Sequence, residues 1–181
     1  RFLDDVSGTS ITSLERYDSV SASIEGEECS IVRTDFASLP GYDLIVSADA
    51  GPRLWEGLST RGQQAGLRPI GVEALEVVRV EQGVPAYGKE LSGDYNPLEA
   101  GLREYISFTK GCYVGQEVVT RLDTYKKVRK RLVGLQWTGG TDSRASPGAK
   151  LLLDGKQAGV VTSATTSPRL EKGVGLAYVG K

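Results

Sequence analysis

The spacing of apolar residues changes twice along this chain, and this change constrains the fold more than any single motif does. Residues 20–34 alternate between apolar and polar side chains around Gly26, a pattern typical of a β-hairpin. Residues 48–67 and 70–91 instead carry apolar side chains at helical spacing, and the second helix is expected to end at Gly83. From about residue 130 the pattern of short strands returns. Strands interleaved with helices and then followed by strands predict an α+β fold: an α/β sandwich before a small antiparallel β unit, part of a barrel or a sandwich.

The ends of these elements carry residues with clear conformational preferences. Asp49 can cap the first helix, Pro52 suits its first turn and Gly66 can end it. In the C-terminal part, Asp154 and Gly155 separate two β-rich segments. An Asp-Gly pair in that position is a strong signal for a two-residue hairpin turn.

The composition excludes several classes of chemistry. The 181 residues contain no histidine, which removes the Ser-His-Asp triad, the Cys-His pair and every imidazole metal ligand. Cys29 and Cys112 are too few for a four-ligand zinc or iron–sulfur site within one chain, so no metal is expected. A net charge of -1 does not favour binding to nucleic acid or anionic membranes. No apolar run approaches the ~20 residues of a membrane span.

The same features indicate where the protein works. Two cysteines without a secretory signal are typical of a reducing setting, so we expect a cytoplasmic protein. The chain contains no methionine at all, and we therefore expect that it does not begin where its gene begins.

Cys112 lies in the segment KGCYVGQE, residues 110–117. Apolar side chains at helical spacing predict a helix over residues 113–122, with Cys112 at its N-terminal edge. Unpaired amide N–H groups at that edge, together with Lys110, would favour the thiolate form. Two interpretations stand side by side: a partly ionised, reactive thiol, or a tight turn in which small residues fit. Cys29, in the second strand of the predicted hairpin, is interpreted as a small buried hydrophobe.

Two further polar features are open to a structural and a functional interpretation. The basic run at residues 126–131 is usually a solvated face, but it could bind an anion such as RNA phosphates or the carboxylate tail of a ligand. Glu81 falls at the end of the second predicted helix, where a carboxylate is usually solvated. In a ligand pocket it could instead accept two hydrogen bonds from an aminopyrimidine-type edge.

Residues 110–121, KGCYVGQEVVTR, resemble the signature of the YgfZ family, the folate-binding relatives of the glycine cleavage system T protein. The signature is essentially K-G-C-aromatic-x-G-Q-E-x-x-x-R, and the chain meets all of its fixed positions. These are Lys110, Gly111, Cys112, Tyr113, Gly115, Gln116, Glu117 and Arg121. The stretches RVEQGVPAYGKEL, NPLEAGL and GVVTSATTSPRLEKGVGLAYV also resemble segments shared with the T protein, so that the resemblance covers nearly the whole chain.

The resemblance implies a ferredoxin-like α/β sandwich domain of this superfamily, followed by a small antiparallel β-barrel domain. Residues 1–19 would be the tail of a largely missing first domain. Residues 20–125 would form the middle, folate-binding domain with the KGCYVGQE motif, and residues 126–181 a C-terminal barrel that we expect to be truncated.

The resemblance also implies a ligand and a function. Tetrahydrofolate is the expected cofactor, with Glu81 on its pterin, Arg121 and Arg131 as further folate-binding residues, and the basic run suited to a polyglutamate tail. Cys112 matches the cysteine on which the activity of the family depends, as a nucleophile, a sulfur acceptor or a transient cluster ligand. The expected role is an accessory factor in the synthesis or repair of iron–sulfur proteins, linked to tRNA modification enzymes. Its partners would be folate and iron–sulfur client proteins, without direct binding to nucleic acid.

Two other hypotheses remain open. The first is a tetrahydrofolate-dependent aminomethyltransferase like the T protein itself. True T proteins carry an acidic T-G-E-D-G loop in the middle domain, where this chain has Ala37, Ser38, Leu39 and Pro40. This difference and the cysteine motif favour the YgfZ family over the aminomethyltransferase. The other hypothesis is a non-enzymatic interaction module that binds tRNA through residues 126–131.

Overall fold

The computed structural model describes residues 1–36, 39–140 and 144–180. Two compact units make up the chain, Arg1–Gly71 and Val72–Lys181. Both combine helices with antiparallel strands, which confirms the predicted α+β class. The domain boundaries at residues 19 and 125 stay predictions. Of the segment compared with the acidic loop, Ala37 and Ser38 lie outside the described residues.

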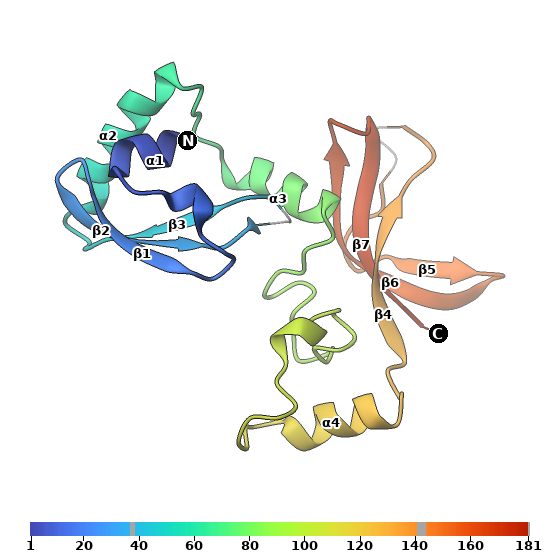
Figure 1. The fold of residues 1–181 in the computed structure, drawn as a ribbon. Helices are drawn as coiled ribbons and strands as arrows, with labels where there is room; N and C mark the ends of the chain where they lie inside the picture. The colour runs from blue at the N-terminus through green and yellow to red at the C-terminus, as the bar shows by residue number, and fades with distance from the viewer. Residues whose placement is uncertain (37–38, 141–143, 181) are drawn as a thin grey trace. The chain divides into compact units, whose positions relative to one another are not determined.

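The described residues of the first unit include helices and strands whose bounds are as follows. In chain order they are α1 (Phe2–Ser7), η1 (Ile11–Ser13), β1 (Ser19–Ile24), β2 (Glu27–Arg33), β3 (Tyr42–Ile45) and α2 (Gly51–Gln64) (Figure 1). The strands form one antiparallel sheet in the order β1-β2-β3. The predicted hairpin is therefore β1 and β2, and the sheet extends it by one strand.

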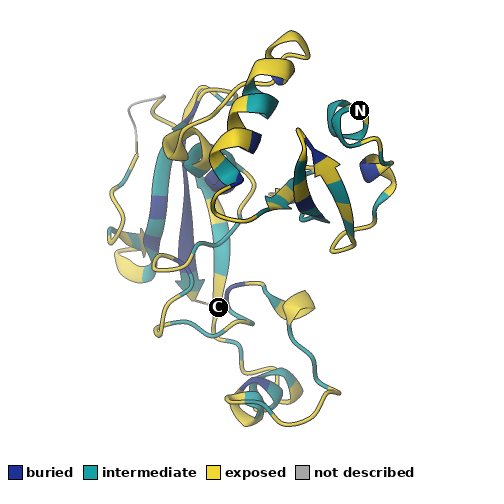
Figure 2. Cartoon of the chain, turned by 90° about the vertical axis from the view of Figure 1, so that its left-hand side faces the viewer, coloured by how far each residue is buried: buried dark blue, intermediate teal, exposed yellow. Residues whose placement is uncertain are grey.

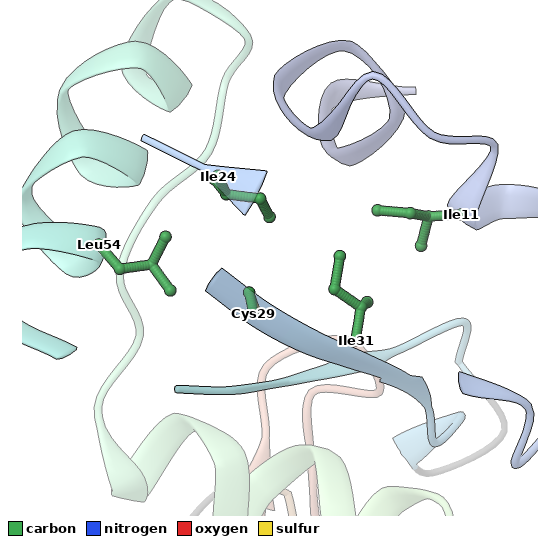
Figure 3. Packing of buried hydrophobic residues seen from close by; sticks show 5 residues of the cluster. All are labelled: Ile11, Ile24, Cys29, Ile31 and Leu54. Atoms are coloured by element: carbon green, nitrogen blue, oxygen red, sulfur yellow. The ribbon is translucent and has the colours of Figure 1, made fainter. Parts of the chain in front are cut away.

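Alternate residues of β2 form the floor of the core in this unit. Cys29 and Ile31 point to the same side of the sheet, where Ile11 of η1, Ile24 of β1 and Leu54 of α2 meet them (Figure 3). Cys29 is 3% exposed, which confirms that it is a buried hydrophobe. This burial raises the pKa of the Cys29 thiol, because a thiolate is poorly solvated in an apolar core.

The helix of the first unit starts differently from the prediction. Its N-cap is Ala50, which makes no side-chain capping hydrogen bond, so the cap predicted at Asp49 is wrong. Pro52 does lie in the first turn of α2. Gly66, just beyond the helix, has φ +81°, the left-handed conformation that lets a helix end at glycine.

Among its described residues, the second unit contains a four-stranded antiparallel sheet and several helical segments. These elements are α3 (Val72–Glu81), η3 (Arg103–Tyr105), α4 (Gln116–Thr124), β4 (Lys130–Gln136), β5 (Lys150–Leu153), β6 (Lys156–Ser167) and β7 (Lys172–Gly180). The strand order is β4-β7-β6-β5. Asp154 and Gly155 form the turn between β5 and β6, both with positive φ, which confirms the predicted hairpin.

Helix α3 packs against the two central strands of this sheet. Val80 of α3 joins Val174 and Leu176 of β7 in a second hydrophobic cluster. The buried residues gather along the central strands (Figure 2). At Gly175 a side chain would not fit, because an added Cβ would lie 2.6 Å from the Trp137 ring and 2.5 Å from the Ser163 carbonyl oxygen. In the described part of the chain, no helix has the length and apolar character needed to cross a membrane.

Candidate functional site

Glu81 is the last residue of α3, and this is an unfavourable place for a carboxylate. The unpaired carbonyl groups at a helix C-terminus carry partial negative charge, which destabilises an anion there by about 0.3–1 kcal/mol. The Glu81 side chain is nevertheless only 8% exposed. Ser167 Oγ donates a hydrogen bond to Glu81 Oε1, and Arg169 Nε donates one to Oε2 at 3.3 Å. A nearly buried carboxylate kept against local preference is a candidate for a functional group.

Ser167 is itself held in place. It ends β6, its side chain is fully buried, and its Oγ accepts a hydrogen bond from the Leu170 amide at 2.9 Å. A serine hydroxyl has one proton to donate, and here the acceptor of that proton is Glu81. The orientation of the hydroxyl is therefore fixed from both sides.

Arg79 anchors the same helix end to the same strand. The Arg79 side chain is 7% exposed, and all five of its N–H donors make hydrogen bonds. Nε and Nη2 bind the Glu76 carboxylate at 2.9 and 2.6 Å, and Nη1 binds the Val84 carbonyl oxygen at 2.6 Å. The remaining two reach Glu90 Oε2 at 2.9 Å and Ser163 Oγ at 2.7 Å.

Glu90 is the second buried carboxylate of this network. Ser163 Oγ donates to Glu90 Oε1 at 2.6 Å, and the Ala86 amide donates to Oε2 at 3.0 Å. Burial by itself raises the pKa of Glu90, but hydrogen bonds from Ser163, Thr162 and Ala86 and the charge of Arg79 outweigh it. The pKa of Glu90 is therefore lowered, and the carboxylate is ionised at neutral pH.

Glu76 is the partly buried end of the same network. Hydrogen bonds from Arg79, and a second one from Lys89, lower the pKa of Glu76 to about 2. The lowered pKa keeps a negative charge beside the guanidinium of Arg79 across the physiological pH range.

A cavity of about 540 Å³ opens in the segment that follows α3. Its lining is mostly apolar and includes Tyr87, Leu91 and Tyr95. The Tyr95 ring stacks on Tyr178 with centroids 3.5 Å apart, and the Tyr178 hydroxyl donates to the Glu90 carbonyl oxygen at 3.0 Å. Burial raises the pKa of Tyr178 to about 12, so it keeps its proton.

The KGCYVGQE segment forms a loop before α4, and the predicted helix start is wrong. The helix begins at Gln116, with Gly115 at the N-cap in a left-handed conformation, φ +87°. Cys112 is therefore three residues before the cap, outside the first helical turn, and it is exposed. The interpretation that helix N–H groups favour its thiolate loses its geometric basis, because that effect is confined to the first turn.

The loop is organised around Ser107. The Tyr113 hydroxyl donates to the Ser107 carbonyl oxygen at 3.0 Å, and Ser107 Oγ accepts from the Lys110 amide at 3.1 Å. The Lys110 ammonium also lies over the Tyr113 ring, 4.9 Å from its centroid. The sequence motif is thus a locally folded unit, and Gly111, exposed like Cys112, lies between these contacts.

The remaining predicted site residues lie on the surface. Glu117 and Arg121 are exposed on α4, Gln116 is partly buried, and Arg131 is exposed on β4. Across the described residues, no hydrogen bond or ion pair joins these side chains or Cys112 to Glu81. The roles predicted for Cys112, Arg121 and Arg131 stay predictions.

Sequence reasoning missed Ser167, which binds Glu81, and the Arg79–Ser163 contact that anchors the same helix end. Arg79 stands two positions before it in RVEQG, and Ser163 and Ser167 are spaced evenly on one face of β6. Both features are visible in the sequence, but no local sequence pattern indicates that these residues contact one another. Within the described ranges, no group of three or more acidic or cysteine side chains is placed to hold a metal ion.

Comparison with known families identifies the superfamily. The model of the GCVT N-terminal domain matches residues 2–110, more than half of the chain. The chain belongs to the glycine cleavage T-protein family. Residues 130–181 match the model of the glycine cleavage T-protein C-terminal barrel domain, which agrees with the antiparallel sheet found there.

Two curated relatives of this T-protein family member are named aminomethyltransferase. An aminomethyltransferase of Halothermothrix orenii is 33% identical over 181 residues, which cover 99% of this chain and 49% of the relative. An aminomethyltransferase of Moorella thermoacetica is 35% identical over 169 residues, 93% of this chain and 45% of the relative. The chain thus spans about half the length of the curated relatives that it matches.

A solved structure has the same fold. The glycine cleavage system aminomethyltransferase T from Bartonella henselae matches with a TM-score of 0.81 at 21% sequence identity. The match covers 99% of this chain and 48% of that protein. It confirms the predicted pairing of an α/β domain with a barrel domain of the T-protein type.

These comparisons correct the predicted function. The resemblance of the KGCYVGQE motif to the YgfZ family favoured an accessory factor for iron–sulfur proteins. That prediction is wrong: the family models and the relatives of T-protein type support the superfamily but favour the aminomethyltransferase hypothesis.

Proposed function

We propose that this chain contributes the tetrahydrofolate-binding carboxylate of an aminomethyltransferase of the T-protein type. The observation that carries the proposal is Glu81, nearly buried at the C-terminal end of α3 and hydrogen-bonded to Ser167. The names of the relatives supply the reaction class, transfer of an aminomethyl group. Tetrahydrofolate would supply the nitrogen atoms that accept the one-carbon unit.

The carboxylate of Glu81 is suited to the pterin edge. A 2-amino-4-oxopteridine presents a ring N–H and an exocyclic amino group side by side, and a carboxylate can accept both. Oε1 keeps one lone pair after its bond from Ser167, and among the described residues Oε2 is bound by Arg169, which is 64% exposed. Two acceptor positions therefore remain for a ligand with two adjacent donors.

The anionic end of folate needs cations. We propose Arg121 and Arg131 for this role, together with the lysines of the basic run, which would also suit a polyglutamate tail. Cys112 remains a proposed functional thiol, because it is exposed within an ordered loop. Both cysteines are free, which fits the reducing, cytoplasmic setting that we propose.

Calorimetry with tetrahydrofolate tests the proposal on the protein at its full natural length. We compare the wild type with Glu81→Gln, which keeps the shape of the side chain but replaces one acceptor oxygen by a donor. Loss of a hydrogen bond to a charged acceptor should weaken binding by at least about tenfold. Glu73→Gln, on the exposed first turn of the same helix, is the matched control and should bind like the wild type.

The outcomes separate the two claims. Absence of binding by the wild type contradicts the folate proposal, and equal affinity of Glu81→Gln contradicts the role of Glu81. For the tail, replacing Lys126, Lys127 and Lys130 by glutamine should weaken polyglutamylated folate more than the monoglutamate. Equal weakening of both ligands would contradict the basic run as the site of the tail.

A further inference from the structure

We infer that Ser167 is a positioning residue, which fixes the plane of the Glu81 carboxylate so that its two free acceptor positions face the pterin edge. The inference rests on the proposed function and adds a residue that selects the ligand through its 2-amino group. Two observations carry it: the hydrogen bond from Ser167 to Glu81, and a second, buried connection between the same helix end and the same strand.

Two side-chain hydrogen bonds join the C-terminal end of α3 to β6. Arg79 binds Ser163 at 2.7 Å, and two residues later Glu81 binds Ser167. The two serines are both buried and lie four residues apart, hence on one face of the strand. A helix end that is attached to a strand by one hydrogen bond can still rotate about that bond. A second hydrogen bond prevents this rotation.

Both attachments are rigid, because each serine hydroxyl makes a second hydrogen bond. Ser163 Oγ accepts from Arg79 and donates to Glu90 Oε1, and Ser167 Oγ accepts from the Leu170 amide and donates to Glu81. Neither hydroxyl can rotate without breaking a buried hydrogen bond. The carboxylate of Glu81 is thus oriented before any ligand arrives, and a preorganised acceptor loses less freedom on binding.

Ser167 and Arg169 hold Glu81 in different ways. Ser167 is fully buried and binds Oε1, so it stays in place when a ligand enters. Arg169 is 64% exposed and binds Oε2 at 3.3 Å, a long contact that water or a ligand donor can replace. A ligand donor can therefore bind Oε2 beside Arg169 or in its place.

The test measures discrimination rather than affinity alone. Dissociation constants are determined for tetrahydrofolate and for its analogue without the 2-amino group, using the full-length protein. The wild type should prefer tetrahydrofolate by at least about tenfold, because the analogue leaves one carboxylate lone pair unused. Ser167→Ala should reduce this preference to about threefold or less, because the carboxylate plane is then free to turn.

Two variants separate positioning from general damage. Ser167→Thr keeps the hydroxyl and should restore the preference, whereas a defect in folding lowers the affinity for both ligands alike. Thr165→Val removes a hydroxyl from the same face of β6, midway between the two serines, and should leave the preference unchanged. If Ser167→Ala does not fold, Ser167→Cys takes its place, since a thiol is only a weak donor.

A double-mutant cycle tests whether Ser167 acts through Glu81. In the Glu81→Gln background, Ser167→Ala should not change the preference further. A wild type that does not bind tetrahydrofolate overturns the proposed function and the inference with it. A wild type that binds and discriminates, with Ser167→Ala discriminating equally well, overturns the inference alone.

Discussion

Arg79 uses all five of its N–H donors inside the protein, and one of them binds the carboxylate of Glu90. Glu90 is fully buried, so without the guanidinium it would be an uncompensated charge. Lysine cannot replace arginine here, because an ammonium has three donors and cannot serve five planar positions.

Replacing Arg79 by methionine should therefore destabilise the second unit by about 3–5 kcal/mol. Arg169→Met is the control: it also removes an arginine bound to a carboxylate, but one that is 64% exposed, and should change stability by less than about 1 kcal/mol. Urea unfolding, followed by circular dichroism, gives both values. A similar loss of unfolding free energy in the two variants would contradict the claim that burial makes the Arg79 contacts more important for stability.

Glu76 makes part of this stability depend on pH. Its pKa falls from 4.5 to about 2 because Arg79, and then Lys89, bind the ionised form. A lowered pKa in the folded state contributes stability above 4.5, and this contribution is lost as the pH falls toward 2. The gap in unfolding free energy between the wild type and Glu76→Gln should be largest near neutral pH and narrow at acid pH. A constant gap from pH 7 to about 2.5 would contradict this assignment.

At the scale of elements, strand β7 is closely packed at Gly175 and cannot accept a side chain there without a shift. Gly175→Ala should destabilise the unit by about 1–3 kcal/mol, because the added Cβ meets the Trp137 ring and a backbone oxygen. Gly134→Ala, on the neighbouring strand β4, meets nothing within 4 Å and should be nearly neutral. Thermal melts of the two variants check the difference, and equal melting temperatures would show that β7 can shift to accept a methyl group.

The elements were largely predictable, and the reason is that their signals are local. Apolar periodicity and turn residues predicted both hairpins and the helices at α2 and α3, since each signal and its consequence lie within a few residues. The start of α4 was not predictable in this way. There Tyr113 turns back to Ser107 and Gly115 takes a left-handed conformation, so the helix begins later than its apolar spacing indicates.

The candidate site was predictable only in part. Glu81 was predicted from its place at a helix end and from a resemblance, whereas Ser167 and the Arg79 network were not predicted. The Glu81 and Ser167 side chains meet although 86 positions separate them, and no local pattern encodes such a pairing. The identity of the partners of a buried carboxylate follows from tertiary packing, which a single sequence does not display.

At the scale of the whole molecule, the connection between the two units is an exposed segment. Residues 66–71 are all exposed, and Ile70 and Val72 are 65% and 81% exposed, respectively. Thermolysin cleaves before large apolar residues, so limited digestion should cut first between residues 66 and 72, as mass spectrometry of the fragments would show. Replacing Ile70 and Val72 by aspartate should delay that cut. First cuts within the strands would contradict the division into two units.

The two-point attachment of α3 to β6 has a consequence for how the protein is made. Arg79 and Glu81 leave the ribosome 84 and 86 residues ahead of the serines that they bind. At ~5–20 residues per second, this is a delay of roughly 4–17 s. During that time α3 has no strand to pack on, and its charged residues remain hydrated. The carboxylate site is thus completed only once Ser163 and Ser167 have been synthesised, and a product that stops short of Ser163 carries Glu81 without its support.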